Sequence, residues 1–352
     1  MKSAYGDGDP MPRLRQTKPS PRVMLDTNVW NYLAAHANAE ALVTAARSGD
    51  VSIVVAPAVV YESMAVTDEA TLHARAHLLT HKAWKRVMPE AYGEAQEVLR
   101  EARRLRPEWL LEHPPRSEFK RLYRDWRDED GGFWSRVRRF PLLASETIRD
   151  TQQEMLNRAR EETKDARKHQ VESTYPVWSA PLGKYWADIP RIPGGSWEDT
   201  ISVAAWRADA YEFWSRHIAA LRGQPTPVDA AGGYIDWLSA ELDFEKLKSD
   251  TASWYNFWLF EVDETAMPRR WLRWAAGLLQ QFSGWSRGTP GDNQLSTYMI
   301  DADVFVTADT GLHRIVEKMH AETPFSLARP ILVSANKSGC RETLELVGRG
   351  AK

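Results

Sequence analysis

Four carboxylates of this 352-residue chain fall where a parallel sheet would gather them. They are Asp26, Glu62, Asp292 and Asp309. Acids that share one crevice repel one another and raise one another's pKa unless a cation lies among them. Mg²⁺ or Mn²⁺ suits an all-carboxylate site, where a bound ion makes a water molecule more acidic and a second ion stabilises the leaving oxygen. The residue types therefore predict a metal-dependent hydrolase of phosphodiesters, with these four acids as catalytic residues and metal ligands.

Two of the acids stand at the ends of predicted strands. Asp26 ends an apolar strand over 22–26, and Asp309 follows an apolar strand over 304–307. Strand ends and the starts of the following helices share one edge of a parallel sheet, which is where such folds bind ligands. We therefore expect both side chains at that edge.

The other two acids belong to predicted helices. Glu62 lies in the first turns of a helix that begins near Pro57, and Asp292 is expected to cap a helix over 293–300. Helix starts lie at the same edge as strand ends, so the pattern predicts that all four acids converge.

Alternating strand and helix signals predict an α/β fold with a parallel sheet. The strands are expected over 22–26, 51–55, 304–307 and 331–334, and the helices over 29–35, 38–48, 269–282, 293–300 and 311–320. Three further acids, Asp50, Asp301 and Asp303, come just before strands. They should lie at the opposite edge, as loop or capping residues.

Two short motifs and two helical acids resemble the PIN-domain family. The motifs are Val23-Met24-Leu25-Asp26-Thr27-Asn28 and Val304-Phe305-Val306-Thr307-Ala308-Asp309, and the helices carry Glu62 and Asp292. That family comprises metal-dependent nucleases, mostly endoribonucleases, and includes the toxins of bacterial toxin–antitoxin pairs. The resemblance implies that the four acids ligate metal in chain order. It also implies that Asn28 and Thr307 support the first and the fourth acid.

The resemblance covers only the two ends of the chain. We expect a flexible tail over 1–20, a discontinuous PIN-like nuclease domain over 21–90 and 268–352, and a helical, Trp- and Arg-rich insertion over 91–267. A compact PIN domain has only a short helical hairpin between its second and third acids. The insertion is therefore expected to be a substrate-selecting lid or a surface for a protein partner such as an inhibitor.

The insertion combines cations with aromatic side chains, the combination that single-stranded nucleic acids bind. Its densest basic point is Arg136, Arg138 and Arg139, a candidate nucleic-acid contact. The alternative is a salt-bridged helix face, because acids are interspersed. Most of the 16 Trp are expected in a helical core, and the segment 251–260 could be a helix or a buried strand.

His73, His77 and His81 recur at four-residue spacing, which would stack three imidazoles on one helix face. Such a face could hold a transition metal. A solvated or domain-facing stripe is the alternative that we favour, because no cysteine or metalloprotease motif accompanies these residues.

The overall composition excludes several classes of protein. A net charge of −2 means that any nucleic-acid binding must rest on a local basic face, and the single cysteine, Cys340, excludes a disulfide framework. No signal-peptide core or membrane-length apolar run is present, so we expect a cytoplasmic protein without a membrane partner. No Walker loop, GxGxxG, GxSxG or zinc-ligand pair appears in the sequence.

The sequence therefore predicts a Mg²⁺- or Mn²⁺-dependent endoribonuclease that cleaves RNA at a four-carboxylate site, and the family resemblance includes toxin-like activity. Two alternatives remain open. One is a structure-specific DNA nuclease of the same fold, and the other is a non-catalytic scaffold that binds RNA or protein.

Overall fold

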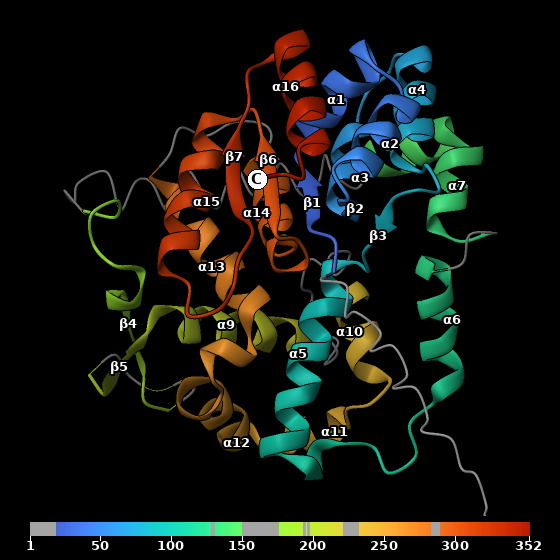
Figure 1. The fold of residues 1–352 in the computed structure, drawn as a ribbon. Helices are drawn as coiled ribbons and strands as arrows, with labels where there is room; N and C mark the ends of the chain where they lie inside the picture. Colours follow the sequence, from blue (N-terminus) through green and yellow to red (C-terminus); the bar gives the residue numbers. More distant parts are fainter. Residues whose placement is uncertain are drawn as a thin grey trace, which may run out of the picture.

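The computed structural model describes residues 19–127, 131–149, 176–192, 195, 198–220, 232–282 and 289–352. Within these ranges the protein is an α/β structure built on a five-stranded parallel sheet (Figure 1). The sheet order is β3-β2-β1-β6-β7. The predicted tail over 1–20 lies outside the described residues, except for its last two positions.

The five strands are short, and the three central ones are buried. They are β1 (Arg22–Leu25), β2 (Ser52–Val55), β3 (Lys85–Arg86), β6 (Val304–Thr307) and β7 (Arg329–Leu332). Four of them were predicted, and their parallel pairing is confirmed. The fifth, β3, was missed because two charged residues on a sheet edge produce no apolar signal.

Chain order places a topological switch point at the centre of the sheet. From β1 the chain winds to β2 and β3 on one side, whereas β6 and β7 lie on the other side. Strand β1 pairs with β6 in the register Val23↔Val304 and Leu25↔Val306. The crevice at the carboxyl ends of β1 and β6 is therefore the position where open parallel sheets bind ligands.

Helices flank the sheet. They are α1 (Thr27–His36), α2 (Ala39–Ser48), α3 (Pro57–Ser63), α4 (Glu69–Leu79), α14 (Thr289–Ser296), α15 (Thr310–Glu322) and α16 (Asn336–Gly348). Helix α16 packs against α1 and α2, and α14 packs against α3. Helix α16 was not predicted.

The section between β3 and α14 is mainly helical. It contains α5 (Glu90–Leu105), α6 (Arg116–Arg127), α7 (Phe133–Arg139), α9 (Ala205–Ala220), α10 (Gly232–Ser239), α11 (Phe244–Ser249), α12 (Thr251–Asn256) and α13 (Pro268–Gln281). Segment 251–260, predicted as either helix or strand, is helical: α12 runs directly into a π-helical turn, η4 (Phe257–Glu261). An antiparallel hairpin of β4 (Trp186–Pro190) and β5 (Thr200–Ala204) also lies in this section. This hairpin was not predicted, because the half-exposed β4 has no continuous apolar run.

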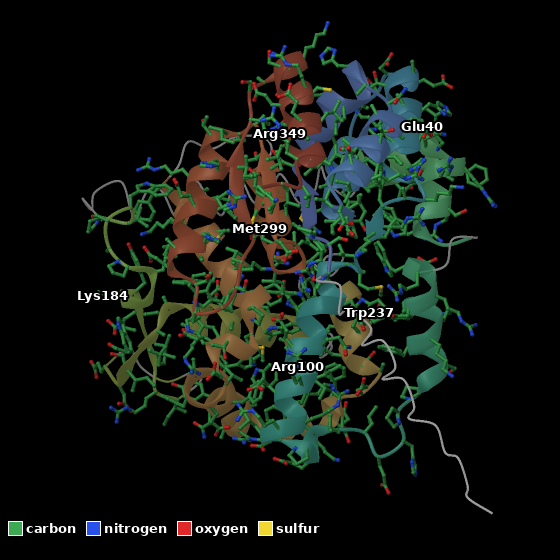
Figure 2. All side chains as sticks on the ribbon, viewed as in Figure 1. Glu40, Arg100, Lys184, Trp237, Met299 and Arg349 are labelled. Carbon is green, nitrogen blue, oxygen red and sulfur yellow. The ribbon has the colours of Figure 1, made fainter. Side chains whose placement is uncertain are left out.

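One hydrophobic cluster joins the sheet to the helical section. It includes Met24 and Phe305 from the sheet and Trp214 and Trp258 from the helical section. In Figure 2, Met299 lies between the strands and the helices of that section. Eleven of the described Trp side chains are buried, as predicted: Trp30, Trp84, Trp109, Trp134, Trp206, Trp214, Trp237, Trp254, Trp258, Trp271 and Trp274. The domain boundaries at 90 and 268 stay a prediction, because this core is continuous across them.

None of the helices in the described ranges combines the length and the apolar character that a membrane crossing requires.

Candidate active site

Asp26 is the centre of the candidate site and stands at the switch point between β1 and β6. Its backbone N–H donates to the carbonyl oxygen of Val306 at 2.8 Å, which extends the sheet by one residue. Its carboxylate caps α1 and accepts from the backbone N–H of Thr27 at 2.7 Å. The side chain is 2% exposed, so a strand end and a helix start together hold a carboxylate in the protein interior.

Thr307 connects the first acid to the fourth. Its hydroxyl donates to Asp26 Oδ2 at 2.8 Å and accepts from the backbone N–H of Asp309 at 3.0 Å. Asp309 in turn caps α15 and accepts from the N–H groups of Gly311 and Leu312 through Oδ1. Thr307 was expected to support the fourth acid, whereas its hydroxyl binds the carboxylate of the first acid and only the backbone of Asp309. Asn28 contributes less, since its Nδ2 lies 3.5 Å from Asp26 Oδ2.

Thr27 connects the first acid to the second. Its hydroxyl donates to Glu62 Oε2 at 2.7 Å, while its backbone N–H holds Asp26. Glu62 is the sixth residue of the seven-residue α3, in the second turn. This function of Thr27 was missed, because in the sequence Thr27 shows only the character of a helix-capping residue.

Asp292 lies inside α14 and does not cap it. The prediction of a helix over 293–300 with Asp292 as its cap was wrong, because α14 begins at Thr289 and ends at Ser296. The neighbouring Gly291 lies against Glu62, where an added Cβ would be 3.2 Å from Oε2. Glycine at this position lets the backbone of α14 approach the carboxylate of α3, a contact that the sequence did not reveal.

Burial and the charges of other acids in the set raise the pKa values of three of the four carboxylates, Asp26, Glu62 and Asp292. Burial and the charges of the other three acids raise the pKa of Asp292 to about 9. Burial, followed by Glu62, raises the pKa of Asp26 to about 7, against hydrogen bonds that lower it. The pKa of Glu62 is raised mainly by burial and to a smaller extent by Asp309. Among the described residues, every charged group that shifts these three pKa values is another acid of the set.

The donor set fits a hard divalent cation in its chemistry. Buried carboxylates that raise one another's pKa without a basic partner are stabilised in their charged form when a cation enters. The geometry is more open than a ligand shell. No group of three or more His, Cys, Asp or Glu side chains in the described ranges is arranged so that it could hold a metal ion.

No family model matches the chain, and neither does any curated protein or solved structure. The site is therefore interpreted from its own residues.

The acids assigned to the opposite edge lie there and have partners of their own. Asp303 accepts from the backbone N–H of Arg22, the first residue of β1, at 2.7 Å, and also pairs with its guanidinium. Asp301 pairs with Arg269 at 2.9 Å. Asp50 has a left-handed backbone (φ 50°) at the turn before β2. The distinction drawn from topology between these three acids and the four candidates is confirmed.

The basic trio lies at exposed positions on α7, and its first two members bind protein groups. Arg136 donates to both carboxylate oxygens of Asp125, and Arg138 donates to the carbonyl oxygen of Thr80 at 3.2 Å. Arg139 is the third member. Arg136 therefore belongs to a salt-bridged helix face, which was the alternative to RNA contact. Contact with RNA stays a prediction for all three arginines.

The histidines do not form the expected stack. Helix α4 ends at Leu79, so His81 lies beyond it. His73 lies 3.8 Å from Glu69, His81 lies 3.9 Å from Glu40, and His77 contacts Arg138. Only His73 and His77 therefore share a face of α4, and the prediction that one helix face carries all three imidazoles was wrong.

Proposed function

We propose that this protein is a Mg²⁺- or Mn²⁺-dependent endoribonuclease of PIN-like fold. The observation that supports the proposal is the convergence of Asp26, Glu62, Asp292 and Asp309 near the switch point of a parallel sheet, where burial and the charges of the other three acids raise the pKa of Asp292 to about 9. Placing four acids together without a basic partner among the described residues costs free energy. A divalent cation bound between them would offset that cost. The order of the four acids along the chain is the order that the PIN resemblance implies.

Asp26, Asp292 and Asp309 would hold the metal, and Glu62 would either ligate it or orient the attacking water. When bound, the cation supplies Lewis acidity to a phosphodiester and neutralises charge on the reacting oxygens. Thr27 and Thr307 keep Glu62 and Asp26 in place through the hydroxyl hydrogen bonds described above. Water would attack the phosphorus in line and the opposite P–O bond would break, which leaves a phosphate on one product and a hydroxyl on the other.

RNA is the substrate that we propose, following the majority activity of the family that the motifs resemble. The segment 91–267 would then cover the acidic crevice as a lid or offer a surface for an inhibitor protein. Toxin-like activity and a cytoplasmic location belong to the same proposal.

One observation favours a non-catalytic scaffold instead: no three of the described His, Cys, Asp or Glu side chains are arranged for an ion. Calorimetric titration with Mn²⁺ separates the two functions. An active site takes up the ion, and its acids release protons, because two of them have pKa values of about 7 and about 9. A scaffold shows neither effect.

The direct test is cleavage of single-stranded RNA, single-stranded DNA and a branched duplex by wild type and Asp26→Asn. We expect metal-dependent cleavage of RNA that Asp26→Asn abolishes without unfolding the chain, since the change removes one charge from a self-repelling cluster. Asp303→Asn, at the opposite edge, is the control that keeps activity. Full activity of Asp26→Asn, or of wild type in excess chelator, would refute the mechanism. Preferential cleavage of the branched duplex would identify the protein as a structure-specific DNA nuclease.

A further inference from the structure

A cavity of about 610 Å³ lies among helices α3, α5, α6, α7, α10 and α14. Aromatic side chains dominate its wall: Tyr61, Trp126, Phe133, Phe140, Tyr234 and Trp237. Three of these rings pack together, with centroids 4.4 Å apart for Trp126 and Phe133 and 5.6 Å apart for Tyr61 and Phe133. Trp237 lies on α10, on the side that faces α6 (Figure 2), where its ring is 5.7 Å from that of Phe119.

The cavity and the acids share two helices. Tyr61 lines the cavity and directly precedes Glu62 in α3, and Gln294 lines it two residues after Asp292 in α14. Consecutive Cα atoms are about 3.8 Å apart, and a helix rises about 1.5 Å per residue. The cavity wall therefore begins within one nucleotide's length of the acid cluster.

Polar groups at fixed positions accompany the aromatic rings. Tyr61, one of the lining residues, carries a hydroxyl group. Glu90 accepts from Gln294 and Tyr298, and Asp125 accepts from Arg136. Each carboxylate has about four lone-pair sites, so both retain acceptor capacity toward the cavity.

We propose that this cavity binds one nucleobase of a single-stranded RNA, next to the phosphate that is cleaved, and prefers bases that carry an exocyclic amino group. The proposal rests on the endoribonuclease function proposed above. It adds a substrate-binding site that the acids alone do not define.

The chemistry of the wall supports a base as the occupant. Unstacked bases of single-stranded RNA bind by stacking on aromatic side chains and by hydrogen bonds to their exposed edges. The carboxylates of Glu90 and Asp125 accept hydrogen bonds, and the amino groups of adenine, cytosine and guanine donate them. Uracil has no amino group and offers only a ring N–H between two carbonyl oxygens, which the negative charge of Glu90 would repel; Asp125 is already paired with Arg136.

Thr147 offers a way to fill the cavity without disturbing the core. It lines the cavity from an exposed position, so Thr147→Trp places an indole in the space that the base would occupy. The matched control is Thr251→Trp, at an exposed position at the start of α12 and outside the cavity wall. Circular dichroism of both variants checks that they fold as wild type does.

The first measurement is the binding of single nucleosides in the presence of chelator, detected by ligand-observed NMR. We expect cytidine, adenosine or guanosine to bind wild type roughly tenfold more tightly than uridine, because their amino groups donate a hydrogen bond to a charged acceptor and uridine has no amino group. Thr147→Trp should weaken binding by about tenfold, and Thr251→Trp should leave it unchanged. Equal binding by Thr147→Trp and wild type would overturn the assignment of the cavity, and equal binding of uridine would overturn the amino preference.

The second measurement maps cleavage sites on one single-stranded RNA of mixed sequence. Wild type should cut beside amino-bearing bases, and Thr147→Trp should lose that preference. If wild type binds nucleosides but cuts no RNA, the nuclease function fails and the cavity assignment stands. If it cuts RNA and Thr147→Trp changes neither nucleoside binding nor the pattern of cuts, the cavity assignment fails alone.

Discussion

Replacing Asp292 with Asn should stabilise the protein and inactivate it. The pKa of the Asp292 carboxyl is raised from 3.8 to about 9 by burial and by the charges of Asp26, Glu62 and Asp309. A raised pKa contributes stability that is complete below pH 3.8 and is lost as the pH rises toward 9. Asn has the shape of the protonated acid and does not titrate, so the variant avoids this loss.

The magnitude follows from the pKa shift. At pH 7 Asp292 keeps its proton in the folded protein and has lost it in the unfolded chain. This pH lies about 3 units above the unfolded pKa of 3.8, which corresponds to about 4 kcal/mol at 1.36 kcal/mol per unit. Asp292 is half-buried, so water screens part of this energy, and we expect about 2 kcal/mol. The gain should disappear near pH 4.

The assay is urea denaturation of wild type and Asp292→Asn in chelator at pH 4, 7 and 9. Asp303→Asn is the matched control, because Arg22 lowers the pKa of Asp303 and its loss should cost at most about 1 kcal/mol. In saturating Mn²⁺ we expect wild type to be more stable to urea than Asp292→Asn, because the bound ion stabilises the folded state of wild type. If Asp292→Asn is no more stable than wild type at pH 7 in chelator, the four acids do not repel one another as the structure indicates.

Two further predictions concern the residues that hold the acids. Thr307→Val removes the hydrogen bond that lowers the pKa of Asp26, so we expect that pKa to rise above about 7 and the pH profile of activity to shift upward. Urea denaturation at pH 8 should show a loss of about 1–2 kcal/mol, and an unchanged pH profile would contradict the role of Thr307. Gly291→Ala places a methyl group 3.2 Å from Glu62 Oε2, and we expect roughly tenfold lower kcat/KM with the thermal midpoint nearly unchanged. Wild-type kcat/KM in that variant would show that the position of Glu62 does not depend on Gly291.

Local sequence determined the strands and the acids at their ends. The stretches at 22–25 and 304–307 are apolar and β-branched or bulky, and each is followed by a carboxylate that caps a helix. These features involve neighbours in the chain, so pattern and spacing are enough to predict them. Parallel topology then separates Asp26 and Asp309 from Asp301 and Asp303, because it decides which end of each strand faces the crevice.

Features that depend on distant residues were missed or misplaced. Strand β3 exists because β2 offers it an edge, and the β4–β5 hairpin exists because its strands pair with each other. Helix α14 begins four residues earlier than expected, so Asp292 lies within it. In the sequence, Thr27 shows only the character of a capping residue, whereas the fold brings Glu62, 35 positions away, to its hydroxyl.

The sequence by itself determined where the carboxylates stand and which edge of the sheet they occupy. Only the tertiary structure decided how strongly they interact, because a pKa of about 9 for Asp292 requires burial and three other charges that lie far away along the chain. The same holds for the aromatic cavity, whose wall joins Tyr61 to Trp126 and Trp237. Chemical type belongs to each residue alone, whereas desolvation and distance exist only after the chain has folded.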